Sequence, residues 1–337
     1  MTRKRILSGM QTTGRLHLGN WLGALKNWVT LQNDYDCYFF AADWHALSSN
    51  YETVGDLKGN LVDLGVNWLA AGLDPEKATL FVQSLIREHA VLHLYFSMIT
   101  PLPWLERVPS YKEKMENIEN RDLHTYGFLG YPVLQAADIV LYQADFVPVG
   151  IDQLPHLELT REIVRRFHDI YRTPVFTEPQ GKLSAVPKLP GIDGRKMSKS
   201  YNNAIYLSDT ADEVATKVKD IVTDAKRVRK TDPGEPNDCV AWKFHEVFST
   251  ADENAVTAQE CRTAARGCVA CKKQLSANIL TSMGPLIEGR AYWEQRPNEV
   301  IDILMAGTDR ARTVAAATLE KAEAALHFDV ASLVKRG

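Results

Sequence analysis

The first half of the chain alternates between short apolar runs and longer segments with helical periodicity, and this alternation limits which folds it can adopt. Three runs are short and apolar enough to be buried parallel strands: Tyr35–Ala42, Ala78–Gln83 and Phe146–Val149. Helices are predicted at Asp56–Ala71, at Arg87–Met98, at Tyr131–Tyr142 with Pro132 in its first helical position, and at Asp152–Phe167. Repeated strand–helix units predict an α/β fold with a doubly wound parallel sheet, whose ligands bind at the carboxyl ends of the strands.

A glycine-rich segment, Ser8–Asn20 (SGMQTTGRLHLGN), lies between the apolar run Arg5–Leu7 and the amphipathic stretch Trp21–Leu25. That order predicts a strand, a turn and a helix, and such a turn lets a phosphate group approach the backbone at the positive end of the helix. The spacing fits neither the Walker A motif nor the Gly-x-Gly-x-x-Gly dinucleotide motif. From the glycines alone, a tight turn without a ligand is an equally good interpretation. A second segment far downstream, Gly194–Ser200, favours the interpretation as a phosphate-binding turn.

Two short motifs carry a family resemblance. His17–Asn20 (HLGN) resembles the first signature of class I aminoacyl-tRNA synthetases, HIGH, and Lys196–Ser200 (KMSKS) matches their second signature at every position. Either motif alone could occur by chance, but the pair in this order and at this separation is specific. Asn20 departs from the histidine of the first signature, as in the tryptophanyl and tyrosyl branch. Its amide can donate a hydrogen bond but cannot carry a proton's charge, so Asn20 is expected to position a ligand rather than act as an acid.

Three more segments narrow the resemblance. Asp43–His45 ends the second predicted strand, Tyr131–Asp138 (YPVLQAAD) lies in a predicted helix, and Gly150–Gln153 (GIDQ) opens another. Together they resemble the tryptophanyl-tRNA synthetase family, and the resemblance extends over nearly the whole chain. The tyrosyl-tRNA synthetases are the alternative within the class. A non-catalytic synthetase-like RNA-binding protein is disfavoured by the intact lysine motif, and a nucleotidyltransferase for a small metabolite by the long helical C-terminal region.

The resemblance implies ATP-dependent activation of L-tryptophan to tryptophanyl-adenylate, followed by transfer of the tryptophanyl group to tRNA(Trp). The carboxylate of the amino acid attacks the α-phosphorus of ATP, so the protein must supply alignment and cations rather than a nucleophile. Mg²⁺ is expected to arrive with ATP. The implied catalytic residues are Gln11, His17, Lys196 and Lys199. The implied ATP-binding residues are Gln11, Thr12, Thr13, His17, Gly19, Asn20, Gly150, Ile151, Asp152, Leu189, Lys196, Met197, Ser198, Lys199 and Ser200.

Five residues are expected to bind tryptophan: His45, Tyr131, Gln135, Asp138 and Gln153. Asp138 is flanked by alanine, isoleucine, valine and leucine, which predicts burial, and a buried carboxylate needs a hydrogen-bond donor. The family resemblance implies that this donor is the indole N–H, and that Tyr131 and Gln153 hold the α-amino group. His45 either lines the indole pocket or is a satisfied histidine at a strand end. Gln135, one turn before Asp138, would make the pocket more polar.

Four cysteines lie in the C-terminal part of the chain with the spacing Cys-x21-Cys-x6-Cys-x2-Cys: Cys239, Cys261, Cys268 and Cys271. Four thiolates suit a tetrahedral zinc ion or a [4Fe–4S] cluster. Zinc sites of this kind usually have two close cysteine pairs, and here there is one. The arrangement resembles a subset of tryptophanyl-tRNA synthetases with an iron–sulphur cluster beside the anticodon-binding region, so the cluster is expected, with zinc and unligated thiols as alternatives. The neighbouring Arg266, Lys272 and Lys273 could contact RNA phosphates.

Composition changes at Pro187–Ser200, a loop rich in proline, glycine and lysine, and from Asp209 onward helical periodicity predominates. The clearest helical segments there are Ala255–Lys273, Leu275–Arg290 and Thr308–His327. We therefore predict a Rossmann-like catalytic domain with a connective insertion at residues 1–208, and a helical tRNA anticodon-binding domain at residues 209–337. A net charge of −3 means that RNA must be met by local basic patches.

The resemblance also implies a homodimer, with Val108–Tyr131 near its two-fold axis and the charged segment Tyr111–Arg121 as an exposed helix unless a partner covers it. No apolar run reaches the roughly 18–20 residues that a membrane span needs. The basic start of the chain is followed only by Ile6 and Leu7 before polar residues resume, and this apolar core is too short for a signal peptide. A cytoplasmic protein without membrane contact is expected.

Overall fold

The fold is built on one parallel sheet. The computed structural model describes residues 3–52, 55–109, 124–183 and 189–328. Its strands are β1 (Arg5–Met10), β2 (Asp36–Ala41), β3 (Ala78–Val82), β4 (Phe146–Val149) and β5 (Gln180–Leu183). All pairings are parallel, in the order β3-β2-β1-β4-β5. The order reverses beside β1, so the predicted doubly wound sheet is confirmed, with its topological switch point between β1 and β4.

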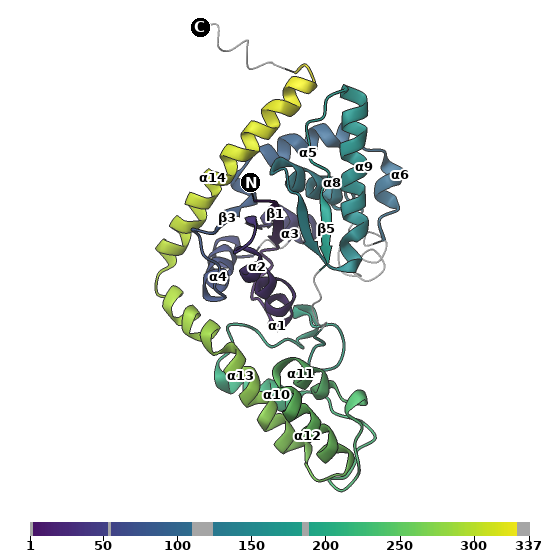
Figure 1. Ribbon diagram of the computed structural model, residues 1–337, viewed down its shortest axis with the longest axis vertical. Helices are drawn as coiled ribbons and strands as arrows, with labels where there is room; N and C mark the ends of the chain where they lie inside the picture. Colours follow the sequence, from purple (N-terminus) through teal and green to yellow (C-terminus); the bar gives the residue numbers. More distant parts are fainter. Residues whose placement is uncertain (1–2, 53–54, 110–123, 184–188, 329–337) are drawn as a thin grey trace.

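Helices cover both faces of the sheet, which explains why consecutive residues of β2 and β3 are buried (Figure 1). On one face, Phe39 of β2 stacks on Trp28 with ring centroids 4.4 Å apart. Tyr38 and Phe40, its neighbours in β2, pack on the other face. The first face is covered by α2 (Lys26–Leu31) and α4 (Leu57–Ala70), and the second by α5 (Glu88–Ile99), α8 (Tyr126–Leu141) and α9 (Leu154–Tyr171).

Short elements follow the carboxyl ends of four strands and bring their residues to one edge of the sheet. They are α1 (Leu18–Asn20) and the π-helical turn η1 (Trp21–Leu25) after β1, α3 (Asp43–Asn50) after β2, η2 (Gln83–Leu85) after β3, and η3 (Ile151–Gln153) after β4. The short helix α6 (Leu102–Glu106) follows α5. Asp43–His45 thus opens a helix instead of ending β2, and the helix expected from Asp152 begins at Leu154 after the turn of η3.

Two further differences from the sequence predictions lie within residues 1–208. The helix α8 begins at Tyr126, because the Thr125 hydroxyl accepts a hydrogen bond from the Phe128 N–H at 3.2 Å and caps it. Pro132 therefore lies inside this helix and not at its first position. The edge strand β5 was not predicted, because its sequence QGKL has no apolar run and two of its residues are exposed.

The C-terminal part is helical, as predicted. It contains η4 (Lys199–Tyr201), α10 (Ala211–Asp220), η5 (Pro236–Asp238), α11 (Val240–Phe248), α12 (Ala251–Arg262), α13 (Cys268–Trp293) and α14 (Pro297–Ala325). The single helix expected over Ala255–Lys273 is wrong, because the chain turns between α12 and α13, where Ala264 has a φ of 58° and Gly267 caps α13.

The last helix returns to the sheet. In Figure 1, α14 lies beside β3, whereas α10 to α12 and the start of α13 form a lobe at the other end of the molecule. The C-terminal half of α13 packs on α4, where Arg290 Nη1 donates to Asn67 Oδ1 at 2.6 Å. The Val82 N–H of β3 donates to the Thr308 hydroxyl of α14 at 3.2 Å. Thus the helical region predicted to start near residue 209 includes a helix that covers the edge of the sheet, and the boundary itself stays a prediction.

The predicted charged helix Tyr111–Arg121, and most of the Val108–Tyr131 segment expected near a two-fold axis, lie outside the described residues. Among the helices that are described, none has the length and the apolar composition that crossing a membrane requires.

Candidate active site

A cavity of about 350 Å³ lies at the switch point, where β1 and β4 end. Its lining includes Gln11 and all five residues expected to bind tryptophan, which are His45, Tyr131, Gln135, Asp138 and Gln153. Much of the remaining wall is apolar, from Leu7, Phe40, Ile139, Val147 and Val149. A cavity of this size, apolar but with a few polar groups, suits a small aromatic ligand.

Asp138 lines this cavity and is 1% exposed, so its predicted burial is confirmed. Its Oδ1 accepts a hydrogen bond from His89 Nδ1 at 2.6 Å and its Oδ2 accepts one from His45 Nε2 at 2.7 Å. Gln83 Nε2 lies 2.9 Å from both oxygens. Burial opposes the charge, but the hydrogen bonds and electrostatic influence of His45, and next those of His89, outweigh it and hold the pKa of Asp138 well below its usual range. The carboxylate is therefore ionised and already supplied with donors.

His45 combines both interpretations that its sequence position allowed, since it lines the cavity and is satisfied by Asp138. Gln83 and His89 were missed by sequence reasoning. Gln83 ends the apolar run ATLFVQ, where a polar residue at the carboxyl end of a strand was an available signal. His89 lies inside α5 and carried no such signal.

Two other side chains of the cavity are oriented by neighbours. The Tyr131 hydroxyl lies 2.8 Å from His156 Nε2, and His156 is 2% exposed. Gln11 Nε2 donates to the His45 carbonyl at 3.4 Å. The turn after β1 is thus connected to the wall that carries Asp138.

The two signature motifs meet in space. Lys199 Nζ donates to the Thr13 carbonyl at 2.8 Å, although 186 residues separate them. Backbone hydrogen bonds join the segments around this contact, from Leu18 N–H to the Ile205 carbonyl at 2.9 Å and from the Leu207 N–H to the Leu16 carbonyl at 2.8 Å. The glycine-rich turn and the loop that carries the KMSKS motif, here called the lysine loop, therefore form one site beside the cavity.

Burial changes the ionisation of one residue from each motif. Burial, and next the charge of Lys199, lower the pKa of His17 to about 4, so the imidazole is neutral near pH 7. Burial also lowers the pKa of Lys199 to about 8, against the smaller opposing influence of Asp63. The Asn20 Oδ1 accepts from the His17 N–H at 3.0 Å, so this side chain is held at the start of α1, and its role toward a ligand stays a prediction.

Asn203, which sequence reasoning missed, holds the lysine loop. It is 1% exposed, its Oδ1 accepts from the Ser198 N–H at 2.8 Å, and its Nδ2 donates to the Lys196 carbonyl at 3.1 Å and to Asp193 Oδ1 at 2.8 Å. A Cβ on Gly191 would lie 2.2 Å from Asn203 Nδ2, so glycine is needed there.

The other residues expected to bind ATP surround this junction. Thr12, Met197 and Leu189 are buried, whereas Lys196 and Ile151 are exposed. Thr13 contacts Lys199, Gly150 precedes η3, and a Cβ on Gly19 would lie 3.8 Å from Met197 Sδ. The side chains of Asp152 and Ser200 lie outside what the structure describes.

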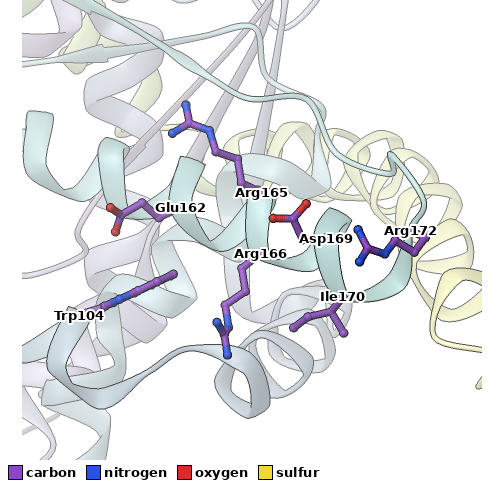
Figure 2. A pocket seen from close by; sticks show the side chains of 7 residues that line it. All are labelled: Trp104, Glu162, Arg165, Arg166, Asp169, Ile170 and Arg172. Atoms are coloured by element: carbon purple, nitrogen blue, oxygen red, sulfur yellow. The ribbon is translucent and has the colours of Figure 1, made fainter.

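A larger cavity, of about 580 Å³, lies between α6 and the C-terminal half of α9 and contains none of the predicted site residues. Figure 2 shows its lining of charged side chains around Trp104 and Ile170. Arg165 is paired with Glu178 at 2.7 Å, and Arg166 donates to the Ile99 carbonyl at 2.5 Å. Arg165 and Arg166 thus have partners, and the acids Glu162 and Asp169 lie in the same lining as Arg172.

The four C-terminal cysteines come from the junctions of α11, α12 and α13, and all are half-buried free thiols. Burial, and next the influence of the other three thiols, raise the pKa of Cys271 to about 12, against a lowering by Arg266. His245 Nε2 lies 3.2 Å from Cys271 Sγ. Within the described ranges, no group of three or more His, Cys, Asp or Glu side chains is arranged to hold a metal ion.

Comparisons with known proteins agree with this geometry. The family model of class I tRNA synthetases for W and Y matches residues 2–282. The tryptophan–tRNA ligase of Thermotoga maritima is 50% identical over 326 residues, which are 96% of this chain and 99% of that protein. The tryptophan–tRNA ligase of Aquifex aeolicus is 40% identical over 96% of this chain and 100% of that protein.

Structural comparison gives the same result. The tryptophanyl-tRNA synthetase of Campylobacter jejuni, complexed with ADP and tryptophan, superposes with a TM-score of 0.85 and 30% identity over 96% of this chain and 99% of that one. The synthetase of Mycoplasma pneumoniae has a TM-score of 0.78 and 28% identity. A tyrosyl-tRNA synthetase of Archaeoglobus fulgidus shares the fold at 20% identity. The chain therefore belongs to the tryptophan–tRNA ligase family of the class I aminoacyl-tRNA synthetases.

Proposed function

We propose that the cavity binds L-tryptophan, that the junction of the two signatures binds ATP, and that the enzyme joins them as tryptophanyl-adenylate before transfer to tRNA(Trp). The contact of Lys199 with Thr13 beside a cavity that contains an ionised, buried Asp138 is the observation that carries this proposal. The Campylobacter jejuni relative complexed with ADP and tryptophan supports it.

In this proposal the cavity residues orient the amino acid. The indole N–H donates to Asp138, Tyr131 and Gln153 hold the α-amino group, and His45 and Gln135 lie along the indole. The apolar wall of the cavity buries the indole ring, and this burial contributes roughly 25 cal/mol of favourable binding free energy for each Å² of apolar surface removed from water.

The signature residues act on ATP. Gln11, Thr12, Thr13, His17, Gly19 and Asn20 hold the nucleotide from the first signature, Gly150, Ile151, Asp152 and Leu189 face its adenosine, and Lys196, Met197, Ser198, Lys199 and Ser200 close on the phosphates. Neutral His17 can accept or donate a hydrogen bond without adding charge. Lys196 and Lys199 stabilise the charge that grows on the departing pyrophosphate, together with Mg²⁺ that enters with ATP.

Tryptophan-dependent ATP–pyrophosphate exchange tests the proposal, with tyrosine and phenylalanine as comparison substrates. Exchange that requires tryptophan, followed by tryptophanylation of tRNA(Trp), is the expected result. Exchange that prefers tyrosine would contradict the assigned substrate, and no exchange with any amino acid would contradict catalysis.

A metal centre at Cys239, Cys261, Cys268 and Cys271 is part of the proposal, with a [4Fe–4S] cluster as the occupant and zinc as the alternative. The four thiols are close enough to affect one another's ionisation, and thiolate is a ligand that both groups prefer. Iron, sulphide and zinc analysis of protein purified without oxygen tests this. Neither iron nor zinc in stoichiometric amount would leave the cysteines as unligated thiols.

A homodimer is proposed for the assembly. Leu94 and Met98 of α5, Leu102 at the start of α6 and Tyr126 at the start of α8 are all more than half exposed, and such a set of apolar side chains favours a protein contact. Light scattering at micromolar concentration is expected to give twice the chain mass of 37.8 kDa. A monomer mass would contradict the dimer.

The region from residue 209 onward is proposed to contact the anticodon arm of tRNA(Trp), with Arg266, Lys272 and Lys273 near the RNA. Because charged tRNA is used by the ribosome, we assign the enzyme to the cytoplasm. Weaker tRNA(Trp) binding by Lys273→Ala, with unchanged pyrophosphate exchange, is the expected result. Equal loss in both assays would contradict this assignment.

A further inference from the structure

Behind the cavity, Asp138 is held by side chains that do not line it and that continue into the core. His89 Nδ1 is 2.6 Å from Asp138 Oδ1, and His89 Nε2 is 2.8 Å from the Tyr142 hydroxyl. His89 and Tyr142 are both 0% exposed. Gln83 Nε2 adds a donor that reaches both carboxylate oxygens at 2.9 Å.

The chemistry of these groups fixes the direction of the hydrogen bonds. An ionised carboxylate can only accept, so His89 must carry a proton on Nδ1. Burial, and next the charge of Asp138, raise the pKa of Tyr142 well above its usual value, so its hydroxyl stays protonated. Among the described residues, His89 Nε2 is the acceptor that this buried hydroxyl reaches, and leaving it unpaired would cost free energy. Tyr142 therefore donates to His89 Nε2, and the ring donates through Nδ1 to Asp138.

We propose that His89, kept in this tautomer by Tyr142, is a positioning residue for tryptophan selection, because it fixes the rotation of the Asp138 carboxylate before the substrate arrives. His45, Gln83 and His89 are three donors to the Asp138 carboxylate, and the indole N–H is the fourth donor. A ring held at both nitrogens does not rotate when the substrate binds, so the acceptor is preorganised. This inference rests on the proposed function, since it takes the indole N–H as the fourth donor.

The experiment compares L-tryptophan with 3-benzothienyl-L-alanine, which has sulphur in place of the indole N–H and nearly the same shape. In pyrophosphate exchange, His89→Leu is expected to lower kcat/KM for tryptophan roughly ten- to a hundredfold, the usual effect of losing a hydrogen bond to a charged group. The analogue has no N–H to donate to the Asp138 carboxylate, so its kcat/KM changes less. The ratio of kcat/KM for tryptophan to kcat/KM for the analogue therefore narrows. The loss is expected in KM for tryptophan, with KM for ATP unchanged.

Two milder variants separate positioning from packing. His89→Asn puts an amide N–H near the place of Nδ1 and is expected to recover most of the ratio that His89→Leu loses. Tyr142→Phe removes only the hydroxyl that selects the tautomer, and is expected to narrow the ratio less than His89→Leu does. Tyr95→Phe is the matched control, because the hydroxyl it removes donates to Glu323 Oε1 at 3.0 Å and not to this network. Its ratio should equal that of the unaltered enzyme.

An unchanged ratio in Tyr142→Phe, or a His89→Asn variant no better than His89→Leu, would overturn the inference and leave His89 as a packing residue. If His89→Leu does not fold, the ratios of His89→Asn and Tyr142→Phe against the unaltered enzyme carry the test. Absence of tryptophan-dependent exchange in the unaltered enzyme would instead refute the proposed function, so the two failures are distinct.

Discussion

Lys199 and Asp138 show how burial changes the chemistry of single residues in this enzyme. Lys199 loses hydration where the two signatures meet, and its pKa falls from 10.5 to about 8. Asp138 is still more buried, yet it stays ionised because three side chains donate to it. Both residues therefore remain charged near pH 7 in surroundings where an isolated charge would be costly.

Lys199→Ala is expected to slow adenylate formation strongly while tryptophan binding stays nearly intact, because the proposed role of the ammonium is to stabilise the charge on the departing pyrophosphate. Losing one such electrostatic contact typically costs roughly 2.7–4 kcal/mol of barrier, a hundredfold or more in kcat. Pyrophosphate exchange and equilibrium binding of tryptophan measure the two effects. Lys77→Ala, which removes an exposed ammonium near Asn33, is the control. Lost tryptophan affinity with unchanged turnover would contradict the assigned role.

The pH dependence of the enzyme should report Lys199. The charged form is the useful one, and the folded pKa lies below the usual value, so the charge is present below about pH 8 and is lost as the pH rises through it. We expect kcat/KM for ATP, which reports the free enzyme, to fall above about pH 8. Lys199→Arg keeps its charge and should remove this basic limb. A limb that persists in Lys199→Arg would belong to another group.

Asp138→Asn is expected to lower kcat/KM for tryptophan more than for phenylalanine. Phenylalanine has no N–H for the carboxylate, so in the unaltered enzyme it lacks a hydrogen bond that tryptophan makes, in addition to the roughly 1–3 kcal/mol that shape alone provides. The amide weakens this advantage of tryptophan, and the ratio of kcat/KM between the two amino acids narrows. Pyrophosphate exchange with both substrates measures it. An unchanged ratio would remove Asp138 from amino-acid selection.

The residues of the cavity were predictable because each lies in a motif with a recognisable neighbourhood. The residues that act through them were not. Gln83 and His89 are 55 and 49 residues from Asp138, and no spacing in one sequence shows that these three meet. Asn203 follows the lysine motif closely, but an asparagine in a loop is ordinary until its bonds to the backbone are seen.

Among the elements, α14 shows most clearly how packing sets a sequence requirement. The helix lies so close to β3 that a Cβ on Gly307 would be 1.8 Å from the Leu80 carbonyl oxygen. Thr308, next in sequence, accepts the Val82 N–H, which has no strand beyond it because β3 is the edge of the sheet. Gly307 permits the close approach of α14 to β3, and the Thr308 hydroxyl accepts a hydrogen bond from a backbone N–H of the edge strand.

Gly307→Ala is expected to destabilise the fold by at least about 1–3 kcal/mol, because the helix must move off the strand. Gly127→Ala in α8 is the matched control, since a Cβ there meets nothing within 4 Å, and it should raise stability by up to about 1 kcal/mol. Urea unfolding of both variants measures the difference. Equal midpoints would contradict the close packing of α14 on β3.

The predictable elements were those with a long or strongly apolar pattern, such as β2, α4 and α14. The sequence did not reveal β5, which is an edge strand with half-exposed residues, or the turn between α12 and α13, which interrupts a continuous helical pattern. Pro132 led to the wrong start for α8, because proline favours the first turn of a helix. The helix instead begins upstream at the Thr125 cap, and Pro132 lies inside it.

At the scale of the whole molecule, the first signature is tied to the start of the helical region. Asp209 has a fully buried carboxylate that binds Arg15 Nη2 at 2.8 Å and Lys217 Nζ of α10 at 2.5 Å. Its Oδ2 also accepts from the Tyr206 N–H at 2.7 Å. One carboxylate thus connects the turn that holds His17 with the lobe that begins at α10.

Asp209→Ala is expected to destabilise the fold by roughly 1.5–3 kcal/mol and to raise KM for ATP, because the signature turn loses its anchor. Asp212→Ala removes an exposed acid in the first turn of α10 and should cost less than about 1 kcal/mol without changing KM. Thermal unfolding and pyrophosphate exchange on both variants provide the comparison. A stable Asp209→Ala with normal KM would show that the tie is not needed.

The position of α14 along β3 also affects how the enzyme is made. Ribosomes release a chain from its N-terminus, so all five strands emerge before Pro297–Ala325 exists. Until that helix is synthesised, the nascent chain carries β3 as a bare strand edge, which other chains can pair with. Both signature motifs are synthesised well before α14. A messenger RNA truncated before the codons for α14 should nevertheless give a fragment that aggregates. The enzyme that charges tRNA for translation thus depends on translation of its own message through the end of α14.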